Sequence, residues 1–556
     1  MGKTETVVQQ PSRVDEQCEV GKPFSTLELP ATDDREQVIE QEPHSTNARA
    51  FYKDQALRAK PSSFKRGRLF KQASIEKRFY LLVADCFTMT LSVVMGYFIA
   101  QVFKSYFLPG LPEVEAVAAF QAFPILFGFP MLLVMLRSEH YGHYSRFRPF
   151  WDEYGQFIKI VVTIAGLTTI YLFFTNTNFS RVWLGATWFF VFFFVPVGRV
   201  LAKRWMMLQG KWFSHTVIIG SGKNALESAL AIESNILMGF KVVALLDLNK
   251  KSGTQEKKSI TDFLSGKDYV YPVLPLDADS GQQLDDMGSP YIVLALESED
   301  YIKHRRLLEQ LVATRHNMSI IPPLRGLPLL GAEISPIFRH EVLHLRIKNN
   351  LASRGSRIVK RFFDLIVSCA LLLVLSPAFL YLGWRIRKDG GPAFYSQSRI
   401  GKHGKSFSCY KFRSMRVNAD KVLKELLASD EELKRQWDQD HKLKEDPRVT
   451  AVGRFLRKTS LDEFPQLLNV FKGEMSLVGP RPISDTELVR YGVQISYYLE
   501  TPPGITGLWQ ISGRNDVDYS TRVNLDAWYA RNWSLWYDIT ILFKTVRVVF
   551  RGSGAY

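Results

Sequence analysis

The segment KRFFDLIVSCALLLVLSPAFLYLGWRIRK, residues 360–388, decides how the parts of this chain are arranged. It exceeds the roughly 20 apolar residues that a helix needs to cross a bilayer core. Ser376 and Pro377 interrupt it, and a proline removes a helical hydrogen bond and kinks or breaks a helix. Lys and Arg stand at both ends. We predict a re-entrant helix that breaks at these two residues and has both ends on the cytoplasmic side; a kinked full crossing is the alternative.

Four other apolar runs precede this segment, and each approaches the length of a membrane-spanning helix. They lie near residues 79–103, 118–136, 157–175 and 182–201. By the positive-inside rule, their flanks predict four crossings with both ends in the cytoplasm. The bases behind this prediction are the run at 57–78, then Arg137, Arg146, Arg148 and Lys159, and finally Arg199, Lys203 and Arg204. Buried helices of a soluble protein are the alternative, which the stretch WLGATWFFVFFFVPVG at 183–198 disfavours.

The chain as a whole is basic, with a formal net charge of +16, which indicates an acidic partner. Nucleic acid, anionic lipid and a phosphorylated substrate all fit, and the apolar runs argue against nucleic acid. The four cysteines show no CxxC spacing. This pattern argues against a disulfide framework or a zinc site and fits a reducing compartment.

Residues 214–345 look soluble and contain HTVIIGSGKNALESALAI, which predicts a strand, a glycine turn and a helix. Gly220, Gly222 and Ala225 have the spacing of a nucleotide-binding turn. The stretch KVVALLDLNK predicts a second strand that ends at Asp247. We predict a Rossmann-like fold. Dinucleotide binding stays a minor alternative, because such a turn often survives as fold geometry alone and no dehydrogenase constellation accompanies it.

Two adjacent carboxylates, Asp462 and Glu463, stand in the stretch SLDEFPQ, residues 460–466, directly after a basic run; we call them the dyad. Ser460 and Glu463 match a capping box, so both could simply cap a helix. Pro465 argues against this role, because proline prefers the first helical position. The dyad would then precede the helix, whose dipole lowers a carboxylate pKa and favours bound anions. One ionised acid suits a nucleophile, and its neighbour suits Mg²⁺, which takes oxygen ligands.

Basic side chains are dense around the dyad and suit a diphosphate, since Arg forks bind phosphate oxygens. They are Arg399, Lys402, Lys405, Lys411, Arg413, Arg454, Arg457, Lys458 and Arg481. Some of them are expected to face only solvent or anionic lipid. Arg481 differs, because the flanking prolines of Gly479-Pro480-Arg481-Pro482 fix its backbone.

Three stretches of the C-terminal part resemble one family of enzymes. They are FYSQSRIGKHGKSFSCYKFRSM, DPRVTAVGRFLRKTSLDEFPQLLNVFKGEMSLVGPRP and PGITGLWQISGRND. Residues 357–556 are similar throughout to the monotopic polyprenyl-phosphate sugar-1-phosphate transferases, which start O-antigen, capsule or exopolysaccharide units in bacteria. The upstream helices and Rossmann-like module resemble the large form of this family.

The resemblance implies a role for each matching residue. Asp462 would be the nucleophile that attacks the sugar-bearing phosphate of a UDP-sugar, which gives a covalent aspartyl-phosphosugar and releases UMP. Glu463, with Asp462, would hold Mg²⁺, and Ser376 and Pro377 would form the break of the re-entrant helix. The residues expected to bind substrate are Arg457, Arg481, Lys411, Arg413, Gln510 and Arg514.

The resemblance also implies partners and a location. The expected partners are a UDP-sugar, undecaprenyl phosphate and inner-membrane lipids, with no nucleic acid and a second copy of the chain in a homodimer. The expected location is the bacterial inner membrane, with the catalytic domain on its cytoplasmic face. Overall similarity favours UDP-galactose as the donor. UDP-glucose and a non-catalytic scaffold of polysaccharide assembly remain alternatives.

The predicted fold is therefore a membrane protein of the α plus α/β class with five segments. They are a disordered cytosolic tail with a basic juxtamembrane run (1–75), four transmembrane helices (76–206), a Rossmann-like cytosolic domain (207–350), a re-entrant helix (357–388) and a small mixed catalytic domain (389–556). The C-terminal stretch NWSLWYDITILFKTVRVVF is expected to be an interfacial amphipathic helix or, equally, a helix packed on its own domain.

Overall fold

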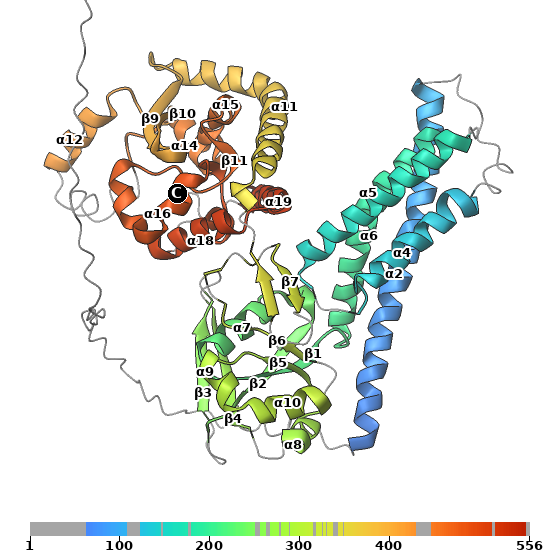
Figure 1. Ribbon diagram of the computed structural model, residues 1–556. Helices are drawn as coiled ribbons and strands as arrows, with labels where there is room; N and C mark the ends of the chain where they lie inside the picture. The colour runs from blue at the N-terminus through green and yellow to red at the C-terminus, as the bar shows by residue number, and fades with distance from the viewer. Residues whose placement is uncertain are drawn as a thin grey trace, which may run out of the picture. The chain divides into compact units, whose positions relative to one another are not determined.

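The computed structural model shows a helical bundle, an α/β module and a C-terminal domain in chain order (Figure 1). We call the last of these the catalytic domain, after the role that the sequence predicts for it. It describes residues 63–551 except 108–122, 146–147, 176–178, 251–255, 263–266, 277–279, 289, 315–317, 325, 328, 330, 337–342, 348–349, 430–445 and 514–517. The predictions for residues 1–62, Arg146 and Arg514 lie outside the described residues.

The bundle consists of long apolar helices that pack against one another. Its elements are α2 (Ser63–Phe107), η1 (Pro124–Gly128), α4 (Phe129–His140), α5 (Phe150–Thr175) and α6 (Arg181–Leu208). Glycines let α2 and α6 approach closely: a Cβ on Gly96 would lie 2.4 Å from Thr187 Oγ1, and one on Gly198 would lie 2.4 Å from Thr88 Cγ2. Small residues at such crossings are typical of helices packed in membranes.

Four helical segments of the described chain are long and apolar enough to cross a membrane. They are Ile75–Phe107, Phe150–Thr175, Arg181–Leu208 and Arg354–Arg387. The predicted crossing at 118–136 is represented by η1 and α4, which are five and 12 residues long. The basic run, expected within the tail, forms the first turns of α2 from Ser63 onward.

A buried ion cluster, formed by Asp85, Glu153, Arg199 and Lys203, lies inside the bundle. Arg199 donates to Asp85 at 2.6 Å and to Glu153 at 3.2 Å, and Lys203 donates to Glu153 at 2.6 Å. Two acids therefore balance two bases away from water, as buried charges require. Arg199 and Lys203, which we used as flanking charges to orient the helices, are neutralised here, whereas Arg204 is exposed.

The module is a six-stranded sheet with helices on both faces. Its strand order is β3-β4-β2-β1-β5-β6, and only β3 runs antiparallel to its neighbour. Helix α7 packs on one face, and α8 and α10 pack on the other. The elements are β1 (Ser214–Ile219), α7 (Lys223–Glu233), η2 (Ile236–Met238), β2 (Phe240–Asp247), β3 (Glu256–Thr261), β4 (Asp268–Pro275), α8 (Ser280–Asp286), β5 (Tyr291–Leu294), α9 (Ser298–Lys303), α10 (Arg305–Thr314) and β6 (Met318–Ile320).

A short hairpin of β7 (Glu333–Pro336) and β8 (Leu343–Arg346), then η3 (Asn350–Ala352), leads to the catalytic domain. That domain packs small helices around two two-stranded sheets. Its elements are α11 (Arg354–Arg387), β9 (Phe394–Ile400), η4 (Lys402–Gly404), β10 (Ser406–Phe412), α12 (Ala419–Ser429), α14 (Ala451–Thr459), η5 (Leu461–Glu463), α15 (Gln466–Lys472), β11 (Ser476–Val478), η6 (Asp485–Gln494), α16 (Ile495–Glu500), β12 (Gly504–Thr506), α17 (Leu508–Ile511), α18 (Tyr519–Arg531) and α19 (Leu535–Arg551).

Helix α11 is bent (Figure 1), and its two arms contact Val470 and Phe464, which are only six positions apart in the chain. In the first arm, Arg361 donates to the carbonyl of Val470 at 2.5 Å; in the second, Phe379 packs on the ring of Phe464. A straight helix would separate Arg361 and Phe379 by about 27 Å, whereas Phe464 and Val470 lie about 9 Å apart along a helix. The chain therefore changes direction within α11, and the proline inside this helix is Pro377.

The C-terminal helix α19 has one packed face and one exposed face. Ile541 is buried in the core of the catalytic domain, and Thr545 hydrogen-bonds Thr506 at 2.8 Å. Phe543 and Val546 are exposed on the other side. Packing of this helix on its own domain is confirmed, and its interfacial role stays a prediction.

Candidate active site

A left-handed residue between two helices presents the dyad. Helix α14 ends at Thr459, and Ser460 takes the left-handed conformation with φ of 56°. This conformation stops α14 and turns the chain into the 3₁₀ turn η5, which carries Asp462 and Glu463. Helix α15 follows at once, with Pro465 at its N-cap. The prediction that the dyad directly precedes a helix is confirmed.

The capping-box alternative is excluded by this geometry. The Ser460 side chain makes no capping hydrogen bond at the start of η5. The expected effect of the helix dipole is also wrong: burial raises the pKa of Asp462 above its ordinary value, Lys411 opposes the rise and Glu463 adds to it. Desolvation of the charged form outweighs the end of a helix that is only seven residues long.

Lys411 reaches the dyad from strand β10. Its ammonium lies 2.7 Å from Glu463 and 4.0 Å from Asp462. Burial acts to lower the pKa of Lys411, but the two carboxylates raise it above its ordinary value, so Lys411 is a cation at neutral pH. Two acids and one base thus share a half-buried site. Lys411 is closer to Glu463 than to Asp462.

Asn469 fixes the distance between Lys411 and the dyad, and sequence reasoning missed it. The side chain is fully buried on α15. Its amide donates to the Ser408 carbonyl at 2.8 Å and accepts from the Tyr410 N–H at 3.1 Å. It therefore completes the hydrogen bonds of the free edge of β10 and ties this strand to the helix that follows the dyad. No local pattern signals this role, because the partners are distant in sequence.

The arginines expected to bind substrate lie in different places. Arg457, on the last turn of α14, donates to the Ser414 hydroxyl at 3.0 Å and acts on Asp462 electrostatically. Arg413 is buried, and its donors go to Asp389 and to the carbonyls of Ile386 and Pro392, which ties β10 to the end of α11.

Arg481 lies away from these contacts, over the ring of Trp509 at 5.6 Å. Arg522, which sequence reasoning did not single out, lies 5.1 Å from the same ring. Gln510 follows Trp509 on α17 and is half-buried. The structure thus gathers Lys411 and Arg457 at the dyad and places Arg481 and Gln510 around Trp509.

The dyad has a donor set that suits Mg²⁺. Across the described residues, no group of three or more His, Cys, Asp or Glu side chains is placed to hold a metal ion. Asp462 and Glu463 nevertheless direct oxygen atoms at one cation, the Lys411 ammonium. Mg²⁺ needs only one or two carboxylates when substrate phosphates supply further oxygens. The residues therefore fit a magnesium ion that arrives with a phosphorylated substrate.

The glycine turn of the module is filled by an acidic side chain of the protein itself. Glu297 accepts a hydrogen bond from the Asn224 N–H at 2.8 Å, at the start of α7. A Cβ added to Gly222 would lie 2.8 Å from the same carboxylate. At the position where a nucleotide-binding turn receives phosphate, this turn holds a carboxylate.

Comparisons with known proteins match two parts of the chain, and the second match below begins within the helical bundle. Residues 355–552 match the family described as bacterial sugar transferase, and residues 139–322 match the family described as CoA-binding domain. A Salmonella typhimurium protein named undecaprenyl-phosphate galactose phosphotransferase is 47% identical over 418 residues, which are 74% of this chain and 84% of that protein.

Two further relatives carry names that differ in the sugar. An Erwinia amylovora protein named UDP-galactose-lipid carrier transferase is 39% identical over 86% of this chain and 97% of its own length. An Escherichia coli protein named UDP-glucose:undecaprenyl-phosphate glucose-1-phosphate transferase is 34% identical over 48% of this chain and 55% of its own length.

Proposed function

The chain belongs to the bacterial sugar transferase family, and on that premise we propose that it transfers a hexose 1-phosphate from a UDP-sugar to undecaprenyl phosphate. The observation that carries this proposal is the dyad, half-buried and faced by Lys411. The reaction would be the first membrane step of O-antigen, capsule or exopolysaccharide synthesis. Galactose 1-phosphate is the proposed group, because the Salmonella typhimurium and Erwinia amylovora relatives are named for galactose.

Asp462 is the proposed nucleophile. Its carboxylate attacks the phosphorus that carries the sugar, the bond from this phosphorus to the bridging oxygen breaks, and UMP leaves with the electron pair. An oxygen of undecaprenyl phosphate then attacks the same phosphorus, and the bond to Asp462 breaks. The carboxylate is regenerated, and a lipid-linked diphospho-sugar results. The covalent route divides one transfer between two anions into two steps.

Basic side chains hold the phosphates during both steps. Lys411 and Arg457 lie next to the dyad and can offset the negative charge that the phosphoryl group carries. Asp462 and Glu463 would hold Mg²⁺, which when bound neutralises charge on the phosphate oxygens. Arg481 would bind a phosphate farther from the reacting atoms.

The bend in α11 supports a proposed membrane arrangement. We infer that α11 is a re-entrant helix of the inner membrane, with the catalytic domain on the cytoplasmic face. Single cysteines at Ile358 and Lys388, in a chain whose own cysteines are replaced, should both react with an impermeant thiol reagent from the cytoplasmic side only. Reaction of Lys388→Cys from the outer side would instead indicate a full crossing.

The α/β module is proposed to be structural, linking the bundle to the enzyme and supporting a homodimer. A deletion of residues 214–345 that still releases UMP but is monomeric would support this role. An unchanged dimer after the same deletion would count against it.

The test of the function is UMP release from UDP-galactose and, separately, UDP-glucose by the purified full-length protein. Undecaprenyl phosphate and Mg²⁺ are supplied, and Asp462→Asn is compared with Asp485→Asn, an exposed carboxylate of the same domain. We expect Asp462→Asn to lower the rate at least about 1000-fold, on the order of the loss when a catalytic nucleophile is removed. Asp485→Asn should be unchanged, and the faster donor identifies the sugar.

Two results would overturn the proposal. Release that survives Asp462→Asn would return the dyad to a structural role. Absence of release from both donors by folded protein would favour another sugar nucleotide or a scaffold of polysaccharide assembly.

A further inference from the structure

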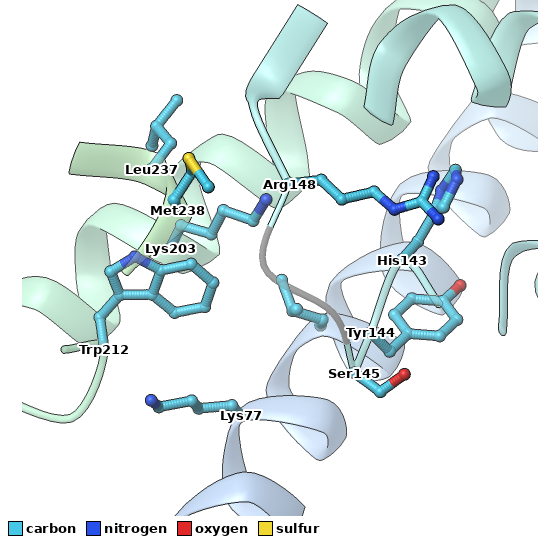
Figure 2. A pocket seen from close by; sticks show the side chains of 10 residues that line it. Lys77, His143, Tyr144, Ser145, Arg148, Lys203, Trp212, Leu237 and Met238 are labelled. Carbon is cyan, nitrogen blue, oxygen red and sulfur yellow. The ribbon is translucent and has the colours of Figure 1, made fainter. Parts of the chain in front are cut away.

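A basic cavity lies where the bundle meets the α/β module, and none of its described lining residues belongs to the catalytic domain (Figure 2). Lys77 of α2, Arg148 before α5, Lys203 of α6 and Trp212 after α6 form much of its wall. The inner space is about 30 Å³ and is continuous with about 410 Å³ that includes solvent at the mouth. A water molecule needs about 10–15 Å³, so the inner space admits about two or three oxygen-sized groups.

The charges that face this cavity are positive. The ammonium groups of Lys77 and Lys203 lie 5.8 and 5.5 Å from the centre of the Trp212 ring, so both approach one side chain (Figure 2). Arg148 adds a third cation, and no acidic side chain is found among the described lining residues. Lys203 is already balanced by Glu153 in the buried ion cluster, so we assign the attraction for an anion to Lys77 and Arg148.

His143 also lines the cavity, and its hydrogen bonds make it neutral. Arg199 can only donate, so the Nδ1 atom of His143, 2.9 Å away, accepts. The Nε2–H group then donates to Gln156 at 3.3 Å. Burial and the adjacent Arg199 lower the pKa of His143 to about 4, which agrees with a neutral ring. His143 therefore adds no positive charge to that of Lys77 and Arg148.

All three cations are held in place by other side chains, and Lys77 donates to the Ser214 hydroxyl at 2.9 Å. Lys203 is 4% exposed and donates to Glu153 at 2.6 Å, within the buried ion cluster. Arg148 donates to the Gln156 carbonyl oxygen at 2.5 Å, the same oxygen that His143 contacts. A ligand therefore meets donors whose positions are already fixed, which reduces the entropy lost on binding.

The position of the cavity, near the ends of the candidate membrane-spanning helices, indicates the kind of ligand. Lys77 is near the start of the span Ile75–Phe107, Arg148 directly precedes the span Phe150–Thr175, and Lys203 is near the end of Arg181–Leu208. These are the ends at which lipid head groups and water meet, and basic residues there attract phosphate. We propose that this cavity is a second anion site that binds a phosphate group, either the head group of an anionic lipid or a soluble phosphate compound.

The test uses the full-length protein in nanodiscs and has one arm for each source. In the first arm, binding of radiolabelled inorganic phosphate is measured in discs of phosphatidylcholine. In the second, the thermal unfolding midpoint is compared between phosphatidylcholine and an equal mixture with phosphatidylglycerol, because a bound lipid raises the midpoint. Lys77→Gln and Arg148→Gln remove the cations, and Arg148→Lys preserves the charge. Lys211→Gln is the matched control, since Lys211 is half-exposed, pairs with Glu76 and does not line the cavity.

We expect at least one arm to respond in the wild type. Each Gln variant should weaken phosphate binding about tenfold or more, or abolish the lipid-dependent rise, since a hydrogen bond to a charged group is worth about 1.5–3 kcal/mol. Arg148→Lys and Lys211→Gln should behave like the wild type. A response in the phosphate arm alone assigns a soluble ligand, and one in the lipid arm alone assigns a head group. No response in either arm, or equal responses of Arg148→Gln and Lys211→Gln, would overturn the proposal.

Discussion

The bundle and the catalytic domain each hold two carboxylates beside basic side chains, but the two clusters differ in access. In the bundle, the Asp85 side chain has no exposed surface and that of Arg199 is 5% exposed. At the dyad, the side chains of Lys411 and Glu463 are 34% and 33% exposed. The same kinds of charge are therefore closed off in one region and open to a substrate in the other.

The two clusters also differ in how the protein itself satisfies their carboxylates. Asp85 accepts from Arg199 and from the Tyr144 hydroxyl, so the protein itself satisfies the charge. The Asp462 carboxylate lies 4.0 Å from the Lys411 ammonium, and burial raises its pKa. A carboxylate satisfied by the fold contributes to one folded arrangement, whereas a carboxylate left partly unsatisfied is available to react.

The largest effect is expected from breaking the closed cluster. Arg199→Met leaves Asp85 and Glu153 buried without their shared partner, which should cost about 3–5 kcal/mol of unfolding free energy. Thermal unfolding of the full-length protein in nanodiscs measures it. Arg204→Met, an exposed arginine of the same helix, is the control and should change the midpoint little. Equal midpoints for the two variants would mean that the cluster does not support the fold.

Removing the basic side chain beside the dyad should affect the reaction more than the stability of the fold. Lys411→Met removes the cation beside both carboxylates, and we expect UMP release to fall about 100-fold, in the range for losing one electrostatic contact in an active site. Stability should change by about 1 kcal/mol or less, because this ion pair is partly exposed. Lys411→Arg should recover part of the rate, and Lys405→Met, an exposed lysine of the same hairpin, should keep it. If Lys411→Met instead prevented folding but left the rate per folded molecule unchanged, Lys411 would serve the fold rather than the reaction.

The pH dependence of UMP release tests whether Asp462 is the ionised nucleophile. The nucleophile must be ionised, and burial raises the pKa of Asp462, so the rate should rise with pH through an inflection above the ordinary range for Asp. Below that inflection, the rate of UMP release at saturating substrate should fall about tenfold per pH unit. Lys411→Met removes a charge that lowers this pKa, so the inflection should move to higher pH. A flat profile would argue against Asp462 as the ionised nucleophile.

Local patterns predicted the parts of this molecule that neighbouring residues determine. The apolar runs predicted long helices, and the stretch containing Gly220 predicted β1, a turn and α7, because periodicity and turn chemistry act over a few residues. The position of the dyad before α15 was predictable for the same reason, since Pro465 marks the start of that helix.

Pairings between distant residues were not predictable. Lys411 and Glu463 are 52 positions apart, and Arg199 and Asp85 are 114 positions apart. A polar residue within an apolar run gives no sign of its partner, so Arg199 was indistinguishable from a flanking charge. The raised pKa of Asp462 also depends on burial by distant segments, which the helix dipole alone does not describe.

The smallest effect on stability is expected from Glu297, an acidic side chain of the α/β module. It accepts from the Asn224 N–H at the start of α7, as a capping carboxylate does. Glu297→Gln keeps an acceptor oxygen but loses the charge, so it should cost about 0.3–1 kcal/mol of stability, the range for a charge at a helix end. Thermal unfolding measures this cost, and UMP release should stay at the wild-type rate because the side chain is outside the catalytic domain. A fall in the rate as large as that of Lys411→Met would show that the glycine turn is coupled to the dyad, and the module would then be more than a structural link.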